Sequence, residues 1–184
     1  DSVVSQINQA AGTGQWCACD AETQWLLDYA DTLHRASAGL FDITSGVLRR
    51  AWDFKAGIVP EPERLSALLA LVGWHDVERA GNQVKLARAG MEIDLGGIGK
   101  EYAADCAATV LARQSVRHGY VNLGGDVRVI GPQPDGQPWL IAIQDPRRRD
   151  QVIATLPMPS GGLATSGDYE KFFERDGRRY CHVL

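Results

Sequence analysis

The order of helical and strand-like patterns along the chain constrains its fold more than any other sequence feature. Apolar residues recur at helical spacing mainly before Gln114. From Tyr120 onward, short strand-like runs alternate with turn signals such as Pro134-Asp135-Gly136 and Asp176-Gly177. Early helices and late antiparallel strands predict an α+β fold, with helices packed on an antiparallel or mixed sheet, rather than a doubly wound parallel sheet.

Start and stop residues place the individual elements. Asp20 with Glu22 predicts the start of a first helix, which Gly39 ends, and Pro60-Glu61-Pro62 opens a later helix that Gly73 stops. We expect helices at about 21–37, near Val47–Trp52, from 62 to 72 with Leu65, Leu68, Leu69 and Val72 on one face, and from 98 to 114 with Ile98, Tyr102, Cys106 and Val110 on one face. We expect strands at 76–79 and 83–87 joined by Gly81-Asn82, then at 91–95, 120–123, 127–130, 139–143, 152–156, 163–166, 172–175 and 179–183.

Length and composition predict one globular domain over residues 1–184. The chain has 184 residues, of which 45% are apolar and 23% are charged. The longest uncharged apolar stretch, Ala67 to Gly73, is far shorter than the roughly 20 residues of a membrane-spanning helix. A net charge of −4 with mostly scattered basic residues argues against a nucleic-acid partner. Four cysteines indicate neither a disulfide scaffold nor a zinc site, so the redox compartment stays undecided.

The two ends of the chain suggest a fragment. The first residues show neither the basic region nor the apolar region of a signal peptide. The chain stops at Tyr180-Cys181-His182-Val183-Leu184, within a strand-like run. We therefore expect the domain to be incomplete at both ends.

The segment from Ile93 to Lys100 is the strongest candidate for a ligand site. It reads as a strand end, the turn Gly96-Gly97-Ile98-Gly99 and a helix start, where backbone N–H groups and the helix dipole favour a phosphate. Glycines also let carbonyl groups approach a cation, with Asp94 and Lys100 as neighbouring charges. A packing role for this turn stays open. The segment lacks the G-x-G-x-x-G spacing, so a Rossmann dehydrogenase is disfavoured.

Three further features could carry chemistry. Asn122-Leu123-Gly124-Gly125-Asp126 and Thr165-Ser166-Gly167-Asp168-Tyr169 are two more glycine turns, each of which is typical of a hairpin or a bulge. Among the four histidines, His182 in the final strand-like run is the one candidate for catalysis. Spacing alone assigns no catalytic triad.

Taken in order, these segments resemble the ApbE family of FAD:protein FMN transferases over nearly the whole chain. The resemblance rests on Ser5-Gln6-Ile7-Asn8, Phe41-Asp42-Ile43-Thr44-Ser45-Gly46 with Trp52, Asp94-Leu95-Gly96-Gly97-Ile98-Gly99-Lys100, Val121-Asn122-Leu123-Gly124-Gly125-Asp126, Pro138-Trp139, Asp145-Pro146, Ala164-Thr165-Ser166-Gly167-Asp168-Tyr169-Glu170 and Tyr180-Cys181-His182-Val183. Glu101 replaces the family's usual glycine, and Val47 replaces its usual proline.

The resemblance implies an ApbE-like flavin transferase fold and a set of site residues. It implies that Gly97 offers its carbonyl group to Mg²⁺ and that His182 is the catalytic base. The family's other metal ligands, an Asp and a Thr, would lie after Leu184, and its first strand would lie before Asp1. The implied FAD contacts are Leu40, Phe41, Asp42, Asp94, Lys100 and Val183.

The implied reaction is a Mg²⁺-dependent transfer of FMN from FAD to a Ser or Thr hydroxyl of an acceptor protein, with release of AMP. The implied acceptor is a subunit of a membrane redox complex, and the implied location is the periplasm, with a lipid anchor on the inner membrane outside this chain. A non-catalytic FAD-binding module and an FAD pyrophosphatase stay as alternatives. So does an α+β domain whose glycine turns serve packing only.

Overall fold

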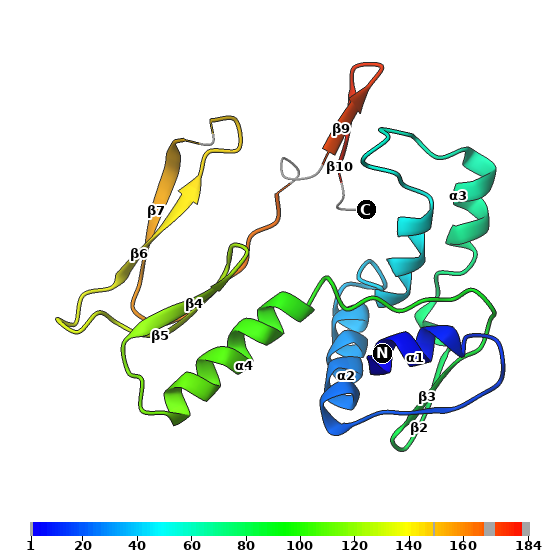
Figure 1. Ribbon diagram of the computed structural model, residues 1–184, viewed down its shortest axis with the longest axis horizontal. Coiled ribbons are helices and arrows are strands. Elements are labelled where there is room, and N and C mark those ends of the chain that lie inside the picture. Colours follow the sequence, from blue (N-terminus) through cyan, green and yellow to red (C-terminus); the bar gives the residue numbers. More distant parts are fainter. Residues whose placement is uncertain (1, 149, 168–171, 182–184) are drawn as a thin grey trace. The chain divides into compact units, whose positions relative to one another are not determined.

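A computed structural model gives the structure of residues 2–148, 150–167 and 172–181 (Figure 1). The chain divides into two compact units, Asp1–Leu95 and Gly96–Leu184. The expectation of a single domain stays a prediction. None of the helices in the described ranges has the length and hydropathy of a membrane-spanning segment.

Unit 1 combines helices with a small antiparallel sheet, against which α1 packs. Its strands are β1 (Cys17–Ala18), β2 (Val77–Ala80) and β3 (Gln83–Leu86), in the order β1-β3-β2. Its helices are α1 (Val3–Gln9), α2 (Ala21–Ala36), the 3₁₀ helix η1 (Ile43–Arg50), α3 (Pro62–Leu69) and the 3₁₀ helix η2 (Trp74–Asp76). The core gathers one buried side chain or more from each of α1, α2, η1, β3 and the segment after β3, namely Ile7, Leu27, Val47, Val84, Leu86, Met91 and Ile93.

The helix α2 begins and ends where the sequence predicts. The Asp20 carboxylate accepts a hydrogen bond from the Thr23 backbone N–H at 2.7 Å, and this bond lowers the pKa of Asp20. At the other end the chain turns away through Ala38 and Gly39, which have φ angles of 53° and 85°. The predicted hairpin around Gly81-Asn82 is also confirmed, as β2 and β3.

The strand predicted at Met91–Leu95 is wrong, because a side chain takes the place of a neighbouring strand. The Ile93 backbone N–H donates to Asn8 Oδ1 at 2.9 Å, and Asn8 Nδ2 donates to the Ile93 carbonyl at 2.9 Å. The Asp94 N–H donates to the Ile43 carbonyl at 2.8 Å. The segment is therefore fixed by α1 and by the start of η1, outside any sheet.

Two helices of unit 1 also differ from expectation. The helical piece predicted near Val47–Trp52 is a 3₁₀ helix that starts earlier, at Ile43, because the Asp42 side chain caps it. The helix after Pro62 ends at Leu69 instead of near Gly73, since the chain turns at Ala70 and Leu71. Its predicted apolar face is not in the core of unit 1, because α3 has no buried residue.

Replacing Asn8 by alanine is expected to destabilise unit 1 by about 2–3 kcal/mol, because it removes two hydrogen bonds and leaves the Ile93 backbone groups unpaired. Urea unfolding followed by tryptophan fluorescence measures this change. Gln9→Ala on the same helix is the control, since Gln9 is exposed and such a change costs less than about 0.5 kcal/mol. Equal stabilities of the two variants would contradict the role of Asn8.

Unit 2 packs one long helix, α4 (Gly99–Arg113), on antiparallel strands. The strands are β4 (Gly119–Leu123), β5 (Asp126–Gly131), β6 (Trp139–Gln144), β7 (Val152–Met158), β8 (Gly161–Leu163), β9 (Phe172–Arg175) and β10 (Arg178–Cys181). They form a sheet in the order β4-β5-β8 and the two hairpins β6-β7 and β9-β10. Every pairing of named strands in the described ranges is antiparallel, which confirms the α+β class.

The residues that α4 buries against its sheet differ from the apolar face that the sequence predicts for this helix. Ala104 and Ala108 are buried, whereas Val110 of the predicted stripe is 57% exposed. Small alanine side chains let the helix lie close to β4 and β5. Of the predicted stripe, Ile98 is also buried, with 5% exposure, and Tyr102 and Cys106 are half-buried. The strand predicted at 163–166 is also shifted, because β8 spans Gly161–Leu163 and its pairing ends at Val127. The strand predicted at 172–175 is confirmed as β9.

The turn between β4 and β5 places Asp126 at the start of a buried strand. Gly124 and Gly125 have φ angles of 65° and 100°, which a two-residue hairpin turn of this kind requires. Asn122 Oδ1 accepts a hydrogen bond from the Gly125 N–H at 2.9 Å and fixes the turn. The glycine pair predicted as a hairpin or a bulge is thus a hairpin, with Leu123 opposite Asp126.

Candidate functional site

In unit 1, the loop after α2 holds an apolar side chain in solvent. Leu40 is 92% exposed. The Phe41 N–H donates to Ser37 Oγ at 2.8 Å, the Gly39 N–H donates to the His34 carbonyl at 2.8 Å, and His34 Nδ1 donates to the Phe41 carbonyl at 2.9 Å. Because the loop is anchored on both sides of Leu40, this exposed leucine is well placed to contact an apolar or aromatic part of a ligand.

The next predicted site residue, Asp42, has a structural role. Its Oδ1 accepts hydrogen bonds from the Thr44 N–H at 2.8 Å and from Thr44 Oγ1 at 2.6 Å. Its Oδ2 accepts from the Trp74 N–H at 3.0 Å, and Thr44 Oγ1 accepts from the Gly73 N–H at 2.8 Å. Asp42 therefore joins the starts of η1 and η2. A direct contact of Asp42 with FAD stays a prediction.

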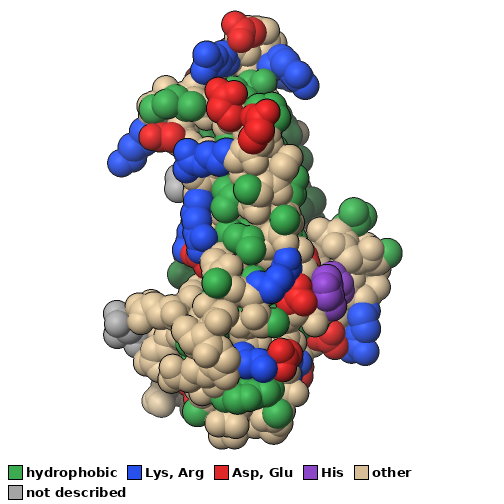
Figure 2. Space-filling view, turned by 90° about the vertical axis from the view of Figure 1, so that its right-hand side faces the viewer, with side chains coloured by type: hydrophobic (Ala, Val, Ile, Leu, Met, Phe, Trp, Pro, Cys, Tyr) green, Lys and Arg blue, Asp and Glu red, His purple; other side chains and the backbone are tan. Residues whose placement is uncertain are grey.

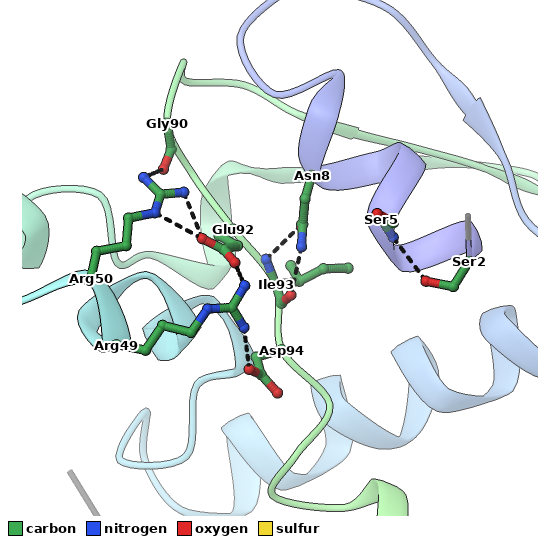
Figure 3. Close-up of polar contacts among 9 residues, drawn as sticks. All are labelled: Ser2, Ser5, Asn8, Arg49, Arg50, Gly90, Glu92, Ile93 and Asp94. Carbon is green, nitrogen blue, oxygen red and sulfur yellow. Dashed lines mark hydrogen bonds and ion pairs between the residues drawn. The ribbon is translucent and has the colours of Figure 1, made fainter. Parts of the chain in front are cut away.

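Asp94, the third predicted site residue of this unit, belongs to a cluster of charges (Figure 3). Arg49 Nη1 donates to Asp94 Oδ2 at 2.8 Å, and Arg49 also pairs with Glu92. Arg50 donates from Nε and Nη2 to Glu92 Oε2 at 2.9 and 2.6 Å. The Glu92 side chain is only 7% exposed and the Asp94 side chain is 37% exposed. The cluster thus runs from a buried carboxylate to one that water reaches.

Gly46 lets Asp94 approach η1 closely. A Cβ atom at Gly46 would lie 2.4 Å from Asp94 Cβ and 3.3 Å from the Asp94 backbone nitrogen. No larger residue fits there without a shift of Asp94. The close packing of Asp94 against η1 therefore requires a glycine at position 46.

In unit 2, Lys100 lies in the first turn of α4 and pairs with Asp126. The distance from Lys100 Nζ to Asp126 Oδ2 is 2.6 Å, and Asp126 Oδ1 accepts a hydrogen bond from the Thr165 N–H at 3.1 Å. Asp126 is buried, with 2% exposure, while the Lys100 side chain is 54% exposed. The hydrogen bond to Asp126 raises the pKa of Lys100. This pair presents a fixed, charged ammonium group to solvent.

The raised pKa of Lys100 gives a testable pH dependence. The pairing of protonated Lys100 with the Asp126 carboxylate stabilises the fold below the ordinary Lys pKa of 10.5, and this contribution is lost as the pH rises through the higher pKa of Lys100 in the folded protein. An NMR titration of Lys100 Nζ should give a pKa above 10.5, and Asp126→Asn should lower it. A pKa at or below 10.5 in the wild-type protein would contradict the pairing.

The turn before α4 leaves the start of this helix open. Gly96 and Gly97 are exposed, and Ile98 at the N-cap is buried and provides no capping hydrogen bond. The helix dipole and the backbone N–H groups of the first turn favour an anion at such a start. Lys100 adds a positive charge in the same turn. These features of unit 2 are those that favour a phosphate group.

The described residues contain no set of three or more His, Cys, Asp or Glu side chains that could hold a metal ion. Gly97 is exposed in its turn, so its position is compatible with a backbone contact to a cation. These residues offer at most one predicted magnesium ligand, and they do not form a metal site by themselves.

Charged side chains also line a shallow pocket of about 240 Å³ in unit 2. Its charged lining residues are Glu101 and Asp105 of α4 and Asp126 and Arg128 of β5, and the remaining ones are Ala104, Val127, Gly162, Leu163 and Ala164. Arg128 Nε lies 3.3 Å from Asp105 Oδ1. Glu101, which departs from the family pattern, therefore adds a carboxyl group to a pocket next to Lys100.

On the face shown in Figure 2, basic side chains lie among acidic and apolar ones. Two site predictions, His182 and Val183, lie outside the described residues, as do Asp168, Tyr169 and Glu170.

Sequence reasoning missed Arg49, Glu92 and Asp126 as members of these clusters. Asp126 directly follows the glycine pair Gly124-Gly125, so its position in the sequence could have indicated it as a candidate. Arg49 and Glu92 pair across 43 positions of the chain, and no local spacing indicates such a pair.

The whole chain matches known proteins. The model of a family described as the ApbE family matches residues 1–184. A protein of Vibrio cholerae named FAD:protein FMN transferase is 32% identical over the whole chain, which covers 56% of that protein. A protein of the same name from Rhodobacter capsulatus is 34% identical over 98% of the chain, which covers 35% of it.

Solved structures of ApbE proteins are also similar to this chain. The ApbE protein of Thermotoga maritima has a TM-score of 0.90 and 37% identity over the whole chain, which covers 60% of it. The apo form of the flavinyl transferase ApbE of Pseudomonas stutzeri has a TM-score of 0.81 and 33% identity, with 58% of that chain covered. The chain spans about a third to three fifths of the length of these relatives.

Proposed function

Because this chain belongs to the ApbE family, we propose that the protein transfers FMN from FAD to a Ser or Thr hydroxyl of an acceptor protein and releases AMP. The relatives' name, FAD:protein FMN transferase, supports FAD as the donor and a protein as the acceptor. The observation in the structure that carries the proposal is the uncapped start of α4, where the Lys100 ammonium is fixed by Asp126. The diphosphate group of FAD is an anion that the N-terminus of such a helix would bind.

We propose that different residues contact different chemical groups of FAD. Lys100 and the N–H groups at the start of α4 would neutralise the diphosphate. Leu40, exposed on its anchored loop, would contact a ring of the dinucleotide. Asp94 would accept a hydrogen bond from FAD, with Phe41, Asp42 and Val183 as further contacts that rest on the resemblance.

The proposed chemical step is a phosphoryl transfer. The acceptor hydroxyl oxygen forms a bond to the phosphorus that carries riboflavin, and the bond from this phosphorus to the bridging oxygen breaks. AMP leaves with the electron pair of that bond, and the hydroxyl proton goes to the imidazole of His182. Lys100, as a fixed cation, would stabilise the negative charge that develops on the phosphate oxygens.

Magnesium dependence is part of this proposal. A divalent cation supplies counter-charge to a diphosphate, and Mg²⁺ commonly uses few protein ligands together with phosphate oxygens. Among the described residues, the Gly97 carbonyl is the proposed ligand. The requirement is tested by FAD-dependent transfer with and without a chelator.

The place of action is also a proposal that rests on the resemblance. We propose a periplasmic protein anchored to the inner membrane by a lipid, with a subunit of a membrane redox complex as the acceptor. Fractionation of the producing cells would test it. Recovery of the protein in the cytoplasm alone would contradict this location.

One incubation distinguishes the candidate activities. The purified full-length protein is mixed with FAD, Mg²⁺ and an acceptor polypeptide, and the products are measured by mass spectrometry and by chromatography of nucleotides. A transferase gives AMP and an acceptor heavier by FMN less one water. An FAD pyrophosphatase gives AMP and free FMN, and a non-catalytic FAD-binding module gives neither. Either of the last two results would contradict the proposal.

A further inference from the structure

Glu92 and Asp94 project from a segment whose backbone is held in place. Met91 and Ile93 alternate with them, and each is only 1% exposed. The Asn8 amide binds both backbone groups of Ile93. The Asp94 N–H binds the Ile43 carbonyl at 2.8 Å. The backbone of Asp94 is thus fixed, and the direction of its carboxylate depends on side-chain partners.

Arg49 connects these two carboxylates. Figure 3 shows its guanidinium between Glu92 and Asp94, with one terminal nitrogen directed at each. Arg50, the next residue of η1, contacts Glu92 and the Gly90 carbonyl, at 3.1 Å for the latter. Among the ion pairs within the described residues, Asp94 pairs with Arg49 and not with Arg50.

The buried end of the cluster makes Arg49 a rigid support. Glu92 is buried and carries an arginine on each carboxylate oxygen, Arg49 on Oε1 and Arg50 on Oε2. A planar guanidinium that binds two carboxylates at once has little freedom to rotate. The 37% exposed Asp94 side chain is therefore held in one orientation, instead of sampling several staggered rotamers.

We propose that Arg49 is a positioning residue for FAD, which acts by holding the Asp94 carboxylate in the orientation that accepts a hydrogen bond from the dinucleotide. This inference rests on the proposed function. Arg50 has the same charge and the same partner in Glu92, but it stabilises the fold only. A carboxylate that is already ordered loses less conformational freedom when it binds a ligand, so Arg49 raises the affinity for FAD.

The test is a double-mutant cycle on the full-length protein, with the dissociation constant of FAD measured by flavin fluorescence and with transfer kinetics. Arg49→Gln is expected to raise the Kd and the KM for FAD by about 5–10-fold and to change kcat by less than about threefold. In Arg49→Gln combined with Asp94→Asn, the Kd should equal that of Asp94→Asn alone within about twofold, because both changes remove the same contact. Arg50→Gln is the matched control, and it should lower the Tm while the Kd stays within about twofold of the wild type.

Three results would overturn the inference while the proposed function stands. They are an unchanged Kd in Arg49→Gln, additive effects of Arg49→Gln and Asp94→Asn, and an equal rise of the Kd in Arg50→Gln. Additivity would mean that Arg49 acts independently of Asp94, and an equal effect of Arg50→Gln would mean that the cluster is structural. A wild-type protein that does not bind FAD would overturn the proposed function as well.

Discussion

His182→Ala is expected to lower kcat for FMN transfer by about 10²–10⁴-fold and to leave the Kd for FAD within about twofold of the wild type. The reason is that the attacking hydroxyl must lose its proton, and a positioned imidazole is the base assigned to that step. The imidazole does not carry the charge of the diphosphate in this proposal, so binding should survive its removal. Single-turnover transfer and FAD titration measure the two quantities on the same preparation.

His75→Ala is the control for this variant. The His75 side chain is 82% exposed and pairs with Asp76 at 3.3 Å, at the end of η2. Its removal should change neither kcat nor the affinity for FAD. Loss of FAD binding in His182→Ala would contradict the assigned role of a base, and full activity would contradict any catalytic role of His182.

Glu92→Ala is expected to destabilise unit 1 by about 2–3 kcal/mol, because it removes the shared anion between two arginines. Removing one partner of a fully buried ion pair would lower the free energy of unfolding by more than this. Arg49 and Arg50 are 59% and 43% exposed, however, so water screens the charges that remain. Urea unfolding followed by tryptophan fluorescence suits this test, because unit 1 contains four of the five tryptophans, at positions 16, 25, 52 and 74.

Glu78→Ala is the matched control in the same unit. Glu78 pairs with Lys85 at 2.8 Å on the hairpin β2-β3, and its side chain is 45% exposed. An exposed pair of this kind contributes less than about 1 kcal/mol. If Glu92→Ala cost no more than Glu78→Ala, the cluster would not anchor Asp94, and the support proposed for Arg49 would also be in doubt.

The sequence predicts those elements whose start and stop residues act locally. Asp20 caps α2 as its position indicates, and the turn at Gly81-Asn82 forms the expected hairpin. Gly124 and Gly125 form another hairpin because only a few residue types adopt the positive φ angles of this turn. The α+β class follows from the order of these elements, so it was predictable as well.

The errors concern interactions between distant parts of the chain. Met91–Leu95 has the apolar pattern of a strand, but Asn8, 85 positions away, binds the backbone of Ile93. On α4, the larger apolar residues suggested a face, whereas the close contact with β5 selects Ala104 and Ala108. Neither partner can be inferred from local spacing, because each depends on how the chain folds back on itself.

In the candidate site, too, local features follow from the sequence, whereas contacts between distant residues do not. The sequence proposes Lys100 as a site residue from its place at a glycine turn before a helix, and that role stays a prediction. The sequence does not indicate its partner Asp126, which belongs to another element. The resemblance implies that Asp94 contacts FAD, which stays a prediction. No local pattern in the sequence indicates that Arg49 pairs with both Asp94 and Glu92. Leu40 is exposed as a ligand contact requires, while the carboxylate of Asp42 caps η1 and binds Trp74.

Hydrogen–deuterium exchange of the full-length protein, with and without FAD, tests most directly whether these residues bind the dinucleotide. We expect slower exchange on FAD addition in the loop at residues 38–42 and in the turn and first helical turn at residues 94–101. We expect unchanged exchange in the hairpin β6-β7. Unchanged exchange in both predicted segments at saturating FAD, or protection confined to other parts of the chain, would contradict the binding of FAD by these residues.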